Sequence, residues 1–472
     1  MGTARNEAGR NDLGRQAPES GAPDIRAGRL DAAAYAAGFE AAVPDLDQQA
    51  ALVEANRCYF CYDAPCIEAC PTGIDIPGFI RKIATGNTAG AALRIYEQNI
   101  FGGSCARVCP TEILCERACV RNTEDGKPIP IGLLQRYATD HGTAANAHPF
   151  RRAASTGRKV AVVGGGPAGL ACAHRLAMHG HDVTVFEARP KLGGLNAYGV
   201  AEYKVPHGYA GREVEFVLDI GGITVETNKM LGRDITLEAL RRDFDAVFLG
   251  LGLGAVKALG CDGEALAGVV NAVDYIADLR QATDFATLPV GRHVVVIGGG
   301  NTAIDIAIQS KRLGAEEVTL VYRRGPEAMS ATGHEQAFAR ENGVIIRHWA
   351  QPVRLEGEAG AVRRAVFEHT SLTTAGRLAG TGEEFSLAAD MVFKAIGQTF
   401  VADPLRGEAG RELLVLKDGR ISADADGRTS LDGVWAGGDC VAGGDDLTVA
   451  AVAAGRRSAE AITQSLRRQA AA

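Results

Sequence analysis

Two glycine-rich turns, each lying between a short apolar strand and a helix, constrain the fold of this chain most strongly. The first follows a strand at residues 159–163 and precedes a helix at 170–179 and a second strand at 182–186, which ends at Glu187. Such glycines let the backbone approach a pyrophosphate at a helix N-terminus, and an acid about 20 residues further on accepts from ribose hydroxyls. The pattern predicts a parallel α/β domain that binds a dinucleotide, with these residues at the turn: Gly164, Gly166, Pro167, Ala168 and Gly169.

The second turn has the same context but a different ending. A strand at 293–297 leads into Gly298-Gly-Gly300, and a helix at 304–313 and a strand at 318–322 follow. This strand ends in Arg323 and Arg324 instead of an acid. Because a guanidinium group pairs with a 2′-phosphate that an acid would repel, we expect an NADP-type nucleotide here, unless both arginines are only solvated surface charges.

A third strand and turn lie near the C-terminus. Val434-Trp-Ala-Gly-Gly-Asp439 precedes a helix at 448–466, and a strand at 391–394 precedes Ala395-Ile-Gly397. In flavoproteins with two dinucleotide domains, such a segment returns to the first domain and presents its Asp to the flavin ribityl chain. We therefore predict a flavin domain at 158–286 and 395–472, with a nucleotide domain at 287–394 inserted in it.

Eight of the 11 cysteines lie between residues 58 and 119. Zinc is one candidate for such a cluster. Cys70-Pro71 and Cys109-Pro110 resemble ferredoxin runs, and a flavin needs an electron exit that zinc does not supply, so iron–sulfur clusters are favoured. A dithiol exit is excluded, since Cys261 is the only cysteine between residues 187 and 395. Spacing alone leaves the pairing of the cysteines with the clusters open.

The first 157 residues show no strand pattern. We expect a disordered leader at 1–28 and a small helical domain at 29–157, with helices at 30–56 (interrupted at Pro44), 76–99 and 131–139. Ile80, Ile83, Leu93 and Ile95 form the predicted apolar stripe of the middle helix.

Composition excludes several classes of protein. The formal net charge is −7 without a Lys/Arg run, which argues against a nucleic-acid partner. No apolar run approaches the roughly 20 residues that span a bilayer, so we expect no membrane segment. We expect no signal peptide, and clustered cysteines in the reducing cytoplasm usually bind metal. Both features favour a cytoplasmic protein.

The motifs resemble a known family. Three segments are similar to the N-terminal half of dihydropyrimidine dehydrogenase: Cys58-x2-Cys61-Tyr-Asp-Ala-Pro-Cys66-x3-Cys70-Pro-Thr, Cys109-Pro-Thr and Ile131-Gly-Leu-Leu-Gln135-Arg-Tyr. The match runs over residues 50–465 and is greatest to the separate pyridine-nucleotide subunit of the bacterial enzyme. The small subunit of glutamate synthase shares the architecture.

The resemblance implies specific roles for residues. One [4Fe-4S] cluster would be held by Cys58, Cys61, Cys66 and Cys119, and the other by Cys70, Cys109, Cys115 and the amide oxygen of Gln135, which leaves Cys105 as a spare thiol. FAD would contact the first turn together with Glu187, Gly194, Leu195, Lys204, Gly438, Asp439, Thr448 and Val449. The nicotinamide nucleotide would contact Gly298, Gly300, Asn301, Thr302, Arg323, Arg324, Ala395, Ile396 and Gly397.

The resemblance also implies a function. NADPH (or NADH) would reduce FAD, and two [4Fe-4S] clusters would pass the electrons to a separate catalytic subunit, expected to contain FMN, that reduces pyrimidines within a hetero-oligomer. The alternatives are a small subunit of NADPH-dependent glutamate synthase and, in another class, a zinc-stapled dinucleotide-binding scaffold. No catalytic side chain is assigned.

Overall fold

The computed structural model describes residues 25–142, 148–405 and 414–471, and the chain forms two compact units. Unit 1 comprises the described residues up to Glu40, Tyr198–Tyr203 and Val256–Gln398, and unit 2 comprises the rest of the described chain. Residues 1–24 of the predicted leader lie outside the described residues. Among the described helices, none combines the length and the apolar character that a bilayer crossing requires.

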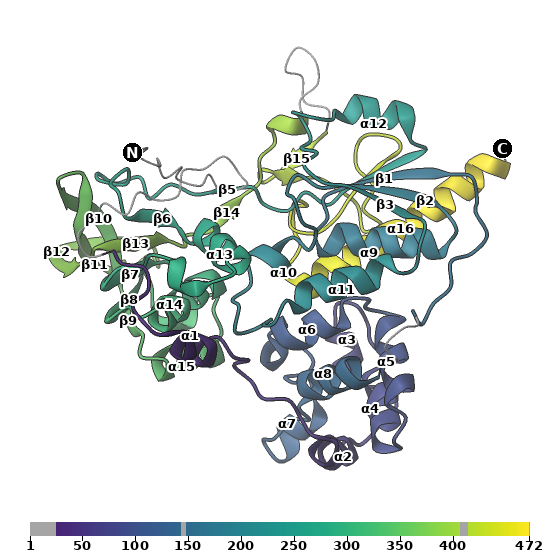
Figure 1. Cartoon of the computed structure of the whole chain (residues 1–472), viewed down its shortest axis with the longest axis horizontal. Coiled ribbons are helices and arrows are strands. Elements are labelled where there is room, and N and C mark those ends of the chain that lie inside the picture. Colours follow the sequence, from purple (N-terminus) through teal and green to yellow (C-terminus); the bar gives the residue numbers. More distant parts are fainter. Residues whose placement is uncertain (1–24, 143–147, 406–413, 472) are drawn as a thin grey trace, which may run out of the picture. The chain divides into compact units, whose positions relative to one another are not determined.

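Unit 2 begins with a segment made of helices (Figure 1). These are α2 (Gln48–Asn56), α3 (Pro65–Glu68), α4 (Ile76–Ala84), α5 (Thr88–Tyr96), α6 (Gly102–Val108), α7 (Val120–Glu124) and α8 (Ile131–His141), with a 3-10 turn at Thr111–Ile113. Asp47 caps α2 by accepting a hydrogen bond from the amide of Ala50 at 2.7 Å. As predicted, no strand precedes Lys159 among the described residues.

The predicted helix at 76–99 is two helices in the structure. Gly86 has a φ of +74°, and the Asn87 side chain accepts from the amide of Gly90 at 2.8 Å, so the chain turns and a new helix begins. The break shifts the helical phase. Ile80, Ile83 and Ile95 are buried as predicted, but Leu93 is 37 % exposed, and its assignment to the apolar stripe was wrong.

A five-stranded parallel sheet forms the core of the rest of unit 2, in the order β17-β4-β1-β2-β3. Its strands are β1 (Lys159–Val163), β2 (Asp182–Phe186), β3 (Ile223–Glu226), β4 (Ala246–Leu249) and β17 (Val434–Ala436). The other elements are α9 (Pro167–Met178), α10 (Leu195–Tyr198), α11 (Tyr209–Leu218), α12 (Leu237–Asp243), α16 (Thr448–Ala471) and the hairpin β15 (Leu416–Lys417) with β16 (Arg420–Ile421).

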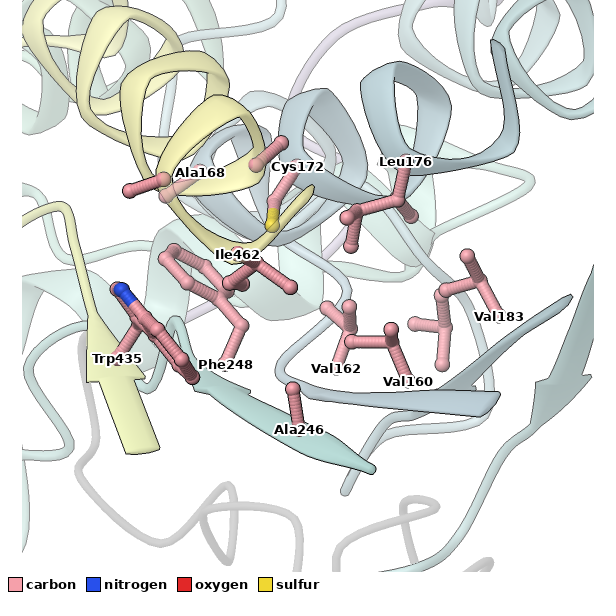
Figure 2. Packing of buried hydrophobic residues seen from close by; sticks show 14 of the residues in the cluster. Val160, Val162, Ala168, Cys172, Leu176, Val183, Ala246, Phe248, Trp435 and Ile462 are labelled. Atoms are coloured by element: carbon pink, nitrogen blue, oxygen red, sulfur yellow. The ribbon is translucent and has the colours of Figure 1, made fainter. Parts of the chain in front are cut away.

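Figure 2 shows why the C-terminal segment belongs to this domain. Phe248 and Trp435 from the sheet pack against Cys172 of α9 and Ile462 of α16. The two helices approach so closely that a Cβ on Gly455 would lie 2.0 Å from the carbonyl oxygen of Ala168. Strand β17 and helix α16, which lie more than 200 residues beyond β1, thus complete the first dinucleotide domain.

Unit 1 holds a second five-stranded parallel sheet, in the order β6-β13-β7-β8-β9. Its strands are β6 (Val269–Asn271), β7 (His293–Ile297), β8 (Glu317–Tyr322), β9 (Ile345–His348) and β13 (Met391–Lys394). An antiparallel sheet adds β10 (Ala350–Glu358), β11 (Ala361–Leu372) and β12 (Leu378–Ala388). The helices are α1 (Ala32–Gly38), α13 (Ala272–Gln281), α14 (Asn301–Arg312) and α15 (Gly333–Glu341).

The chain passes between the units in β5 (Ala255–Val256) and β14 (Gln398–Thr399), which pair with each other. Because β6 pairs with β13, unit 1 takes in residues from Val256 onward, ahead of the boundary at residue 287 expected from the sequence.

Candidate functional site

Four cysteines from both sequence blocks line one cavity in the helical segment. Cys58, Cys61 and Cys66 come from the loop after α2 and from α3, and Cys119 precedes α7. The cavity wall is otherwise largely apolar and includes Pro65, Ile76, Pro77, Ile80, Ile129 and Ile131. Four sulfur donors in an apolar cavity fit a [4Fe-4S] cluster, which is held by thiolates and tuned by burial. The grouping is the one that the resemblance implies, and it differs from a division of the cysteines by block.

The thiols of this first group influence one another. Burial and the neighbouring Cys58 and Cys119 raise the pKa of Cys66 to about 12. Burial also raises the pKa of Cys58, with smaller contributions from Cys119 and Cys61. The protein alone therefore disfavours four thiolates here, and a bound cation would reverse that balance.

A second group of cysteines lies around helix α6. A hydrogen bond with Cys105, burial, and the neighbouring Cys105, Cys115 and Cys70 raise the pKa of Cys109 well above the ordinary value. Gln135, on α8, is buried, and its amide nitrogen donates to the carbonyl oxygen of Gly102 at 2.7 Å. That bond orients the side chain through its nitrogen and leaves the amide oxygen as the atom with ligand character. The assignment of Gln135 as a ligand remains a prediction, as do those of the cysteines.

The first glycine turn forms a cradle without side chains. Gly164 has a φ of +105°, and a Cβ there would lie 2.2 Å from the carbonyl oxygen of Gly250. Gly194 has a φ of +52°, and its Cβ would lie 2.6 Å from the Cα of Gly166. Helix α9 begins at Pro167, and no side chain caps it. Its first amide groups are thus left for an anion, as the pyrophosphate of FAD requires.

The remaining flavin candidates differ in exposure. Glu187 is buried and accepts from the amides of Gly165 and Arg189, both at 2.7 Å. Burial raises the pKa of Glu187, and each carboxylate oxygen has a further lone pair for a ribose hydroxyl. Leu195, by contrast, is 42 % exposed, and Lys204 is half-buried.

The C-terminal flavin candidates surround the start of α16. Asp439 is half-buried, and burial, together with the nearby Asp446, raises its pKa to about 6. The Thr448 hydroxyl donates to the side-chain oxygen of Asn196 at 3.1 Å. Gly438 has a φ of +76°, and a Cβ there would lie 3.0 Å from that of Ala168 at the start of α9. Gly438 and Ala168, 270 residues apart in sequence, are thus neighbours in the fold. Val449, the remaining candidate, is buried.

The second glycine turn lies beside the residues that follow β13. A Cβ on Gly298, whose φ is +150°, would lie 2.2 Å from the carbonyl oxygen of Ala395. Ile396 and Gly397 continue from that point, while Asn301 and Thr302 form the uncapped start of α14. The turn therefore offers backbone amides to an anion in the same way as the first.

Arg323 and Arg324 follow the end of β8 and are exposed. Their backbone oxygens accept from the Thr370 hydroxyl at 2.8 Å and from the amide of Trp349 at 3.3 Å. Within the described residues neither guanidinium group forms an ion pair. Both are thus accessible to a phosphate, although their role in binding stays a prediction.

Two family models match the chain. The model of the pyridine nucleotide-disulphide oxidoreductases matches residues 158–455, more than half of the chain. The chain belongs to this family. A second model, dihydropyrimidine dehydrogenase domain II with a 4Fe-4S cluster, matches residues 35–147.

Similar proteins have several names. The chain is 36 % identical to the NAD-dependent dihydropyrimidine dehydrogenase subunit PreT of Escherichia coli O157:H7, over 87 % of this chain and 93 % of that protein. It is 34 % identical to the glutamate synthase [NADPH] small chain of Halomonas elongata, over 96 % and 97 %. It is 35 % identical to the NADP(+)-dependent formate dehydrogenase subunit beta of Moorella thermoacetica, over 86 % and 60 %.

Solved structures support the fold alone. FprA of Mycobacterium tuberculosis in complex with NADPH superposes with a TM-score of 0.53 at 21 % identity, covering 66 % of this chain and 85 % of that one. Thioredoxin reductase of Lactococcus lactis superposes with a TM-score of 0.50 at 22 % identity, covering 66 % and 99 %.

These matches confirm the predicted family, the α/β fold with a helical iron–sulfur segment, and the class of NAD(P)H-dependent flavin oxidoreductase. The match to a 4Fe-4S model favours iron–sulfur over structural zinc in the cysteine-rich segment.

Two features of the structure have no counterpart in the sequence analysis. Glu213, on α11, is buried and accepts from the amide of Ser104 at 2.9 Å and from its hydroxyl. Its place on the same helical face as Ala210, Val214 and Val217 is a signal that could have found it. The other feature is the segment Tyr198–Tyr203, which packs within unit 1 although its neighbours in sequence belong to unit 2.

Proposed function

We propose that this chain is the electron-input subunit of a pyrimidine-reducing enzyme. When bound, FAD takes up a hydride from NADPH or NADH, and two [4Fe-4S] clusters carry single electrons onward to a separate subunit. That subunit is expected to contain FMN and to form a hetero-oligomer with this chain in the cytoplasm. Relatives named as subunits of larger enzymes support the hetero-oligomer.

The grouping of the cysteines carries the proposal. Cys58, Cys61, Cys66 and Cys119 line one cavity although they come from two separate blocks. The cavity belongs to the same compact unit as the first glycine turn, where FAD is expected. Between residues 187 and 395 the sequence has no pair of closely spaced cysteines that could reduce a disulfide. A flavin domain with a cysteine-lined electron exit suits one-electron transfer to a partner instead.

The residues of the chain contribute binding and orientation. The cradle of Gly164, Gly166, Gly194 and Gly438 would hold the FAD pyrophosphate at the start of α9, and Glu187 and Asp439 would supply carboxylate oxygens for its hydroxyl groups. Gly298, Gly300, Asn301 and Thr302 do the same for the pyridine nucleotide. Arg323 and Arg324 favour a nucleotide with a 2′-phosphate. Hydride transfer needs no acid or base from the protein, so no side chain is assigned a catalytic role.

The first experiment uses the purified chain under anaerobic conditions. We expect NADPH to bleach the flavin absorbance and an artificial one-electron acceptor to be reduced, whereas uracil is not reduced until the partner subunit is added. Reduction of uracil by the chain alone would contradict the division of labour. Failure of both nucleotides to bleach the flavin would contradict the proposed function itself.

A glutamate synthase small chain is the second candidate, because the Halomonas elongata relative aligns over 96 % of the chain. The two candidates differ in the partner that restores activity. A dihydropyrimidine dehydrogenase catalytic subunit with uracil is expected to restore turnover, and a glutamate synthase large chain with glutamine and 2-oxoglutarate is not.

A further inference from the structure

A six-residue segment, residues 198–203, is attached to the helices of unit 1. The amide of Ala201 donates to Asp305 at 3.4 Å, and the amide of Glu202 donates to the side-chain oxygen of Gln309 at 3.1 Å. The hydroxyl of Tyr203 donates to Asp305 at 3.1 Å. Side chains of a single helix, α14, thus hold three consecutive residues. We call residues 198–203 the tether.

Buried charge strengthens the attachment. Glu202 forms an ion pair with Arg280 of α13, and the two side chains are only 16 % and 4 % exposed. Burial lowers the pKa of Arg280, and Glu202 opposes that shift. Loss of one member of a buried ion pair leaves the other charge without compensation, which is far more costly than loss of a surface pair.

The aromatic ring of Tyr203 adds a second anchor. Tyr203 is fully buried, the Arg312 guanidinium lies 4.4 Å from its ring centre, and Phe338 of α15 packs beside it. Arg312 itself donates to the carbonyl oxygen of Gly38 at 2.7 Å and to Asn342 at 2.9 Å. The tether is therefore part of a continuous polar network within unit 1.

Helix α14 carries two sets of residues along its length. Its first residues, Asn301 and Thr302, follow the second glycine turn, where the pyridine nucleotide is expected. Asp305, Gln309 and Arg312, about one, two and three turns further on, lie on one face and contact the tether. A single rigid helix thus joins the nucleotide turn to the tether.

Both ends of the tether continue directly into flavin candidates. Leu195 lies three residues before Tyr198 in α10, and Lys204 follows Tyr203 without an intervening residue. Any displacement of the tether along α14 is thereby transmitted by covalent bonds to residues expected at the flavin.

We propose that Glu202 and Tyr203 are positioning residues for hydride transfer, because they fix the flavin-contacting segments to the helix that binds the pyridine nucleotide. The inference rests on the proposed function. In the step concerned, a hydride leaves the reduced nicotinamide and enters FAD, so the nucleotide is oxidised and the flavin is reduced by two electrons. The tether contributes no atoms to this step and acts only through orientation.

The test compares Glu202→Gln and Tyr203→Phe with the wild type. Misplacement of reacting groups by about 1 Å costs up to roughly a hundredfold in rate. We expect the rate of flavin bleaching at saturating NADPH to fall about tenfold or more in Glu202→Gln and severalfold in Tyr203→Phe, with KM for NADPH and FAD content unchanged. The matched control is Glu384→Gln, which removes an exposed ion pair with Arg354 in the same unit and is expected to leave the rate unchanged.

A second readout needs no turnover. NADP+ is titrated into each oxidised variant, and its effect on the flavin absorbance spectrum is compared with its affinity from calorimetry. We expect both tether variants to bind NADP+ as the wild type does but to show a weaker spectral change. Tyr203→Phe keeps the buried ring and decides the question if Glu202→Gln fails to fold.

Three outcomes would overturn the inference. The first is a bleaching rate in both variants equal to that of the wild type. The second is loss of FAD from Tyr203→Phe, and the third is a rise in KM without a fall in the bleaching rate. Each would show that the tether is not a positioning element. A wild type that NADPH does not reduce would instead contradict the proposed function, and with it the role of the tether.

Discussion

Replacement of Glu213 by Gln tests the electrostatics between the helical segment and the flavin domain within unit 2. Glu213 accepts hydrogen bonds from the amide and the hydroxyl of Ser104. Arg107, whose charge lowers the pKa of Glu213, is engaged by both oxygens of Asp140 at 2.7 and 2.9 Å. Burial therefore dominates and raises the pKa of Glu213 from 4.5 to about 7. Gln keeps the shape but does not ionise: its side-chain oxygen accepts from the amide of Ser104, and its NH2 group donates to the Ser104 hydroxyl, which turns to accept.

The sign of the pH effect follows from proton binding. Between pH 4.5 and about 7 the folded chain keeps a proton on Glu213 that the unfolded chain has released, so stability falls as the pH rises through this window. At 1.36 kcal/mol per pKa unit, the full loss is about 3 kcal/mol. About 2 kcal/mol of it falls between roughly pH 5.5 and 8. Glu213→Gln should therefore gain about 2 kcal/mol relative to the wild type across that range.

Thermal unfolding, followed by circular dichroism at several pH values, measures this difference. We expect the melting temperature of Glu213→Gln to rise relative to the wild type by a few degrees between roughly pH 5.5 and 8. Glu215→Gln, an exposed carboxylate on the same helix, is the control and should show no such trend. A difference in melting temperature between variant and wild type that does not change with pH would contradict the raised pKa of Glu213.

Three further predictions concern the cofactors. Gly194→Ala should lose FAD on gel filtration, because its Cβ would lie 2.6 Å from the Cα of Gly166 at a φ of +52°, whereas Gly211→Ala, with open space around it, should retain FAD. Cys105→Ala should keep eight iron atoms per chain by metal analysis; a loss of four would assign Cys105 as a ligand. Arg323→Ala should raise KM for NADPH about tenfold and change KM for NADH little, because the loss of a charge-assisted hydrogen bond costs about 1.5–3 kcal/mol. An unchanged ratio of the two KM values would show that Arg323 is only a surface charge.

The bounds of several strands could be predicted because they depend on short local stretches of sequence. The strands 182–186, 293–297 and 391–394 have the bounds expected from sequence, because each is a short run of buried apolar residues bounded by turns or charges. Leu93 was misplaced because a capped break at Asn87 resets the helical phase, and a capping side chain is a weaker signal than the apolar periodicity across it.

Features that depend on distant contacts could not be predicted in the same way. The partner of Glu213 lies 109 residues away, and the tether contacts helices about 80 to 135 residues further along the chain. Spacing likewise left the pairing of the cysteines open. The family resemblance implied that Cys119 joins the first block, and the fold brings Cys119 to the cavity of that block. Sequence motifs therefore locate the glycine turns of the cofactor sites better than they locate contacts between residues that are far apart in the chain.

We propose that two [4Fe-4S] clusters in the cysteine-rich segment are the electron exit of the flavin domain. Analysis of iron, acid-labile sulfide, zinc and FAD in the anaerobically purified wild-type chain tests this proposal. We expect eight iron atoms, eight sulfides and one FAD per chain, without zinc. Four iron atoms per chain, or zinc in place of iron, would contradict it.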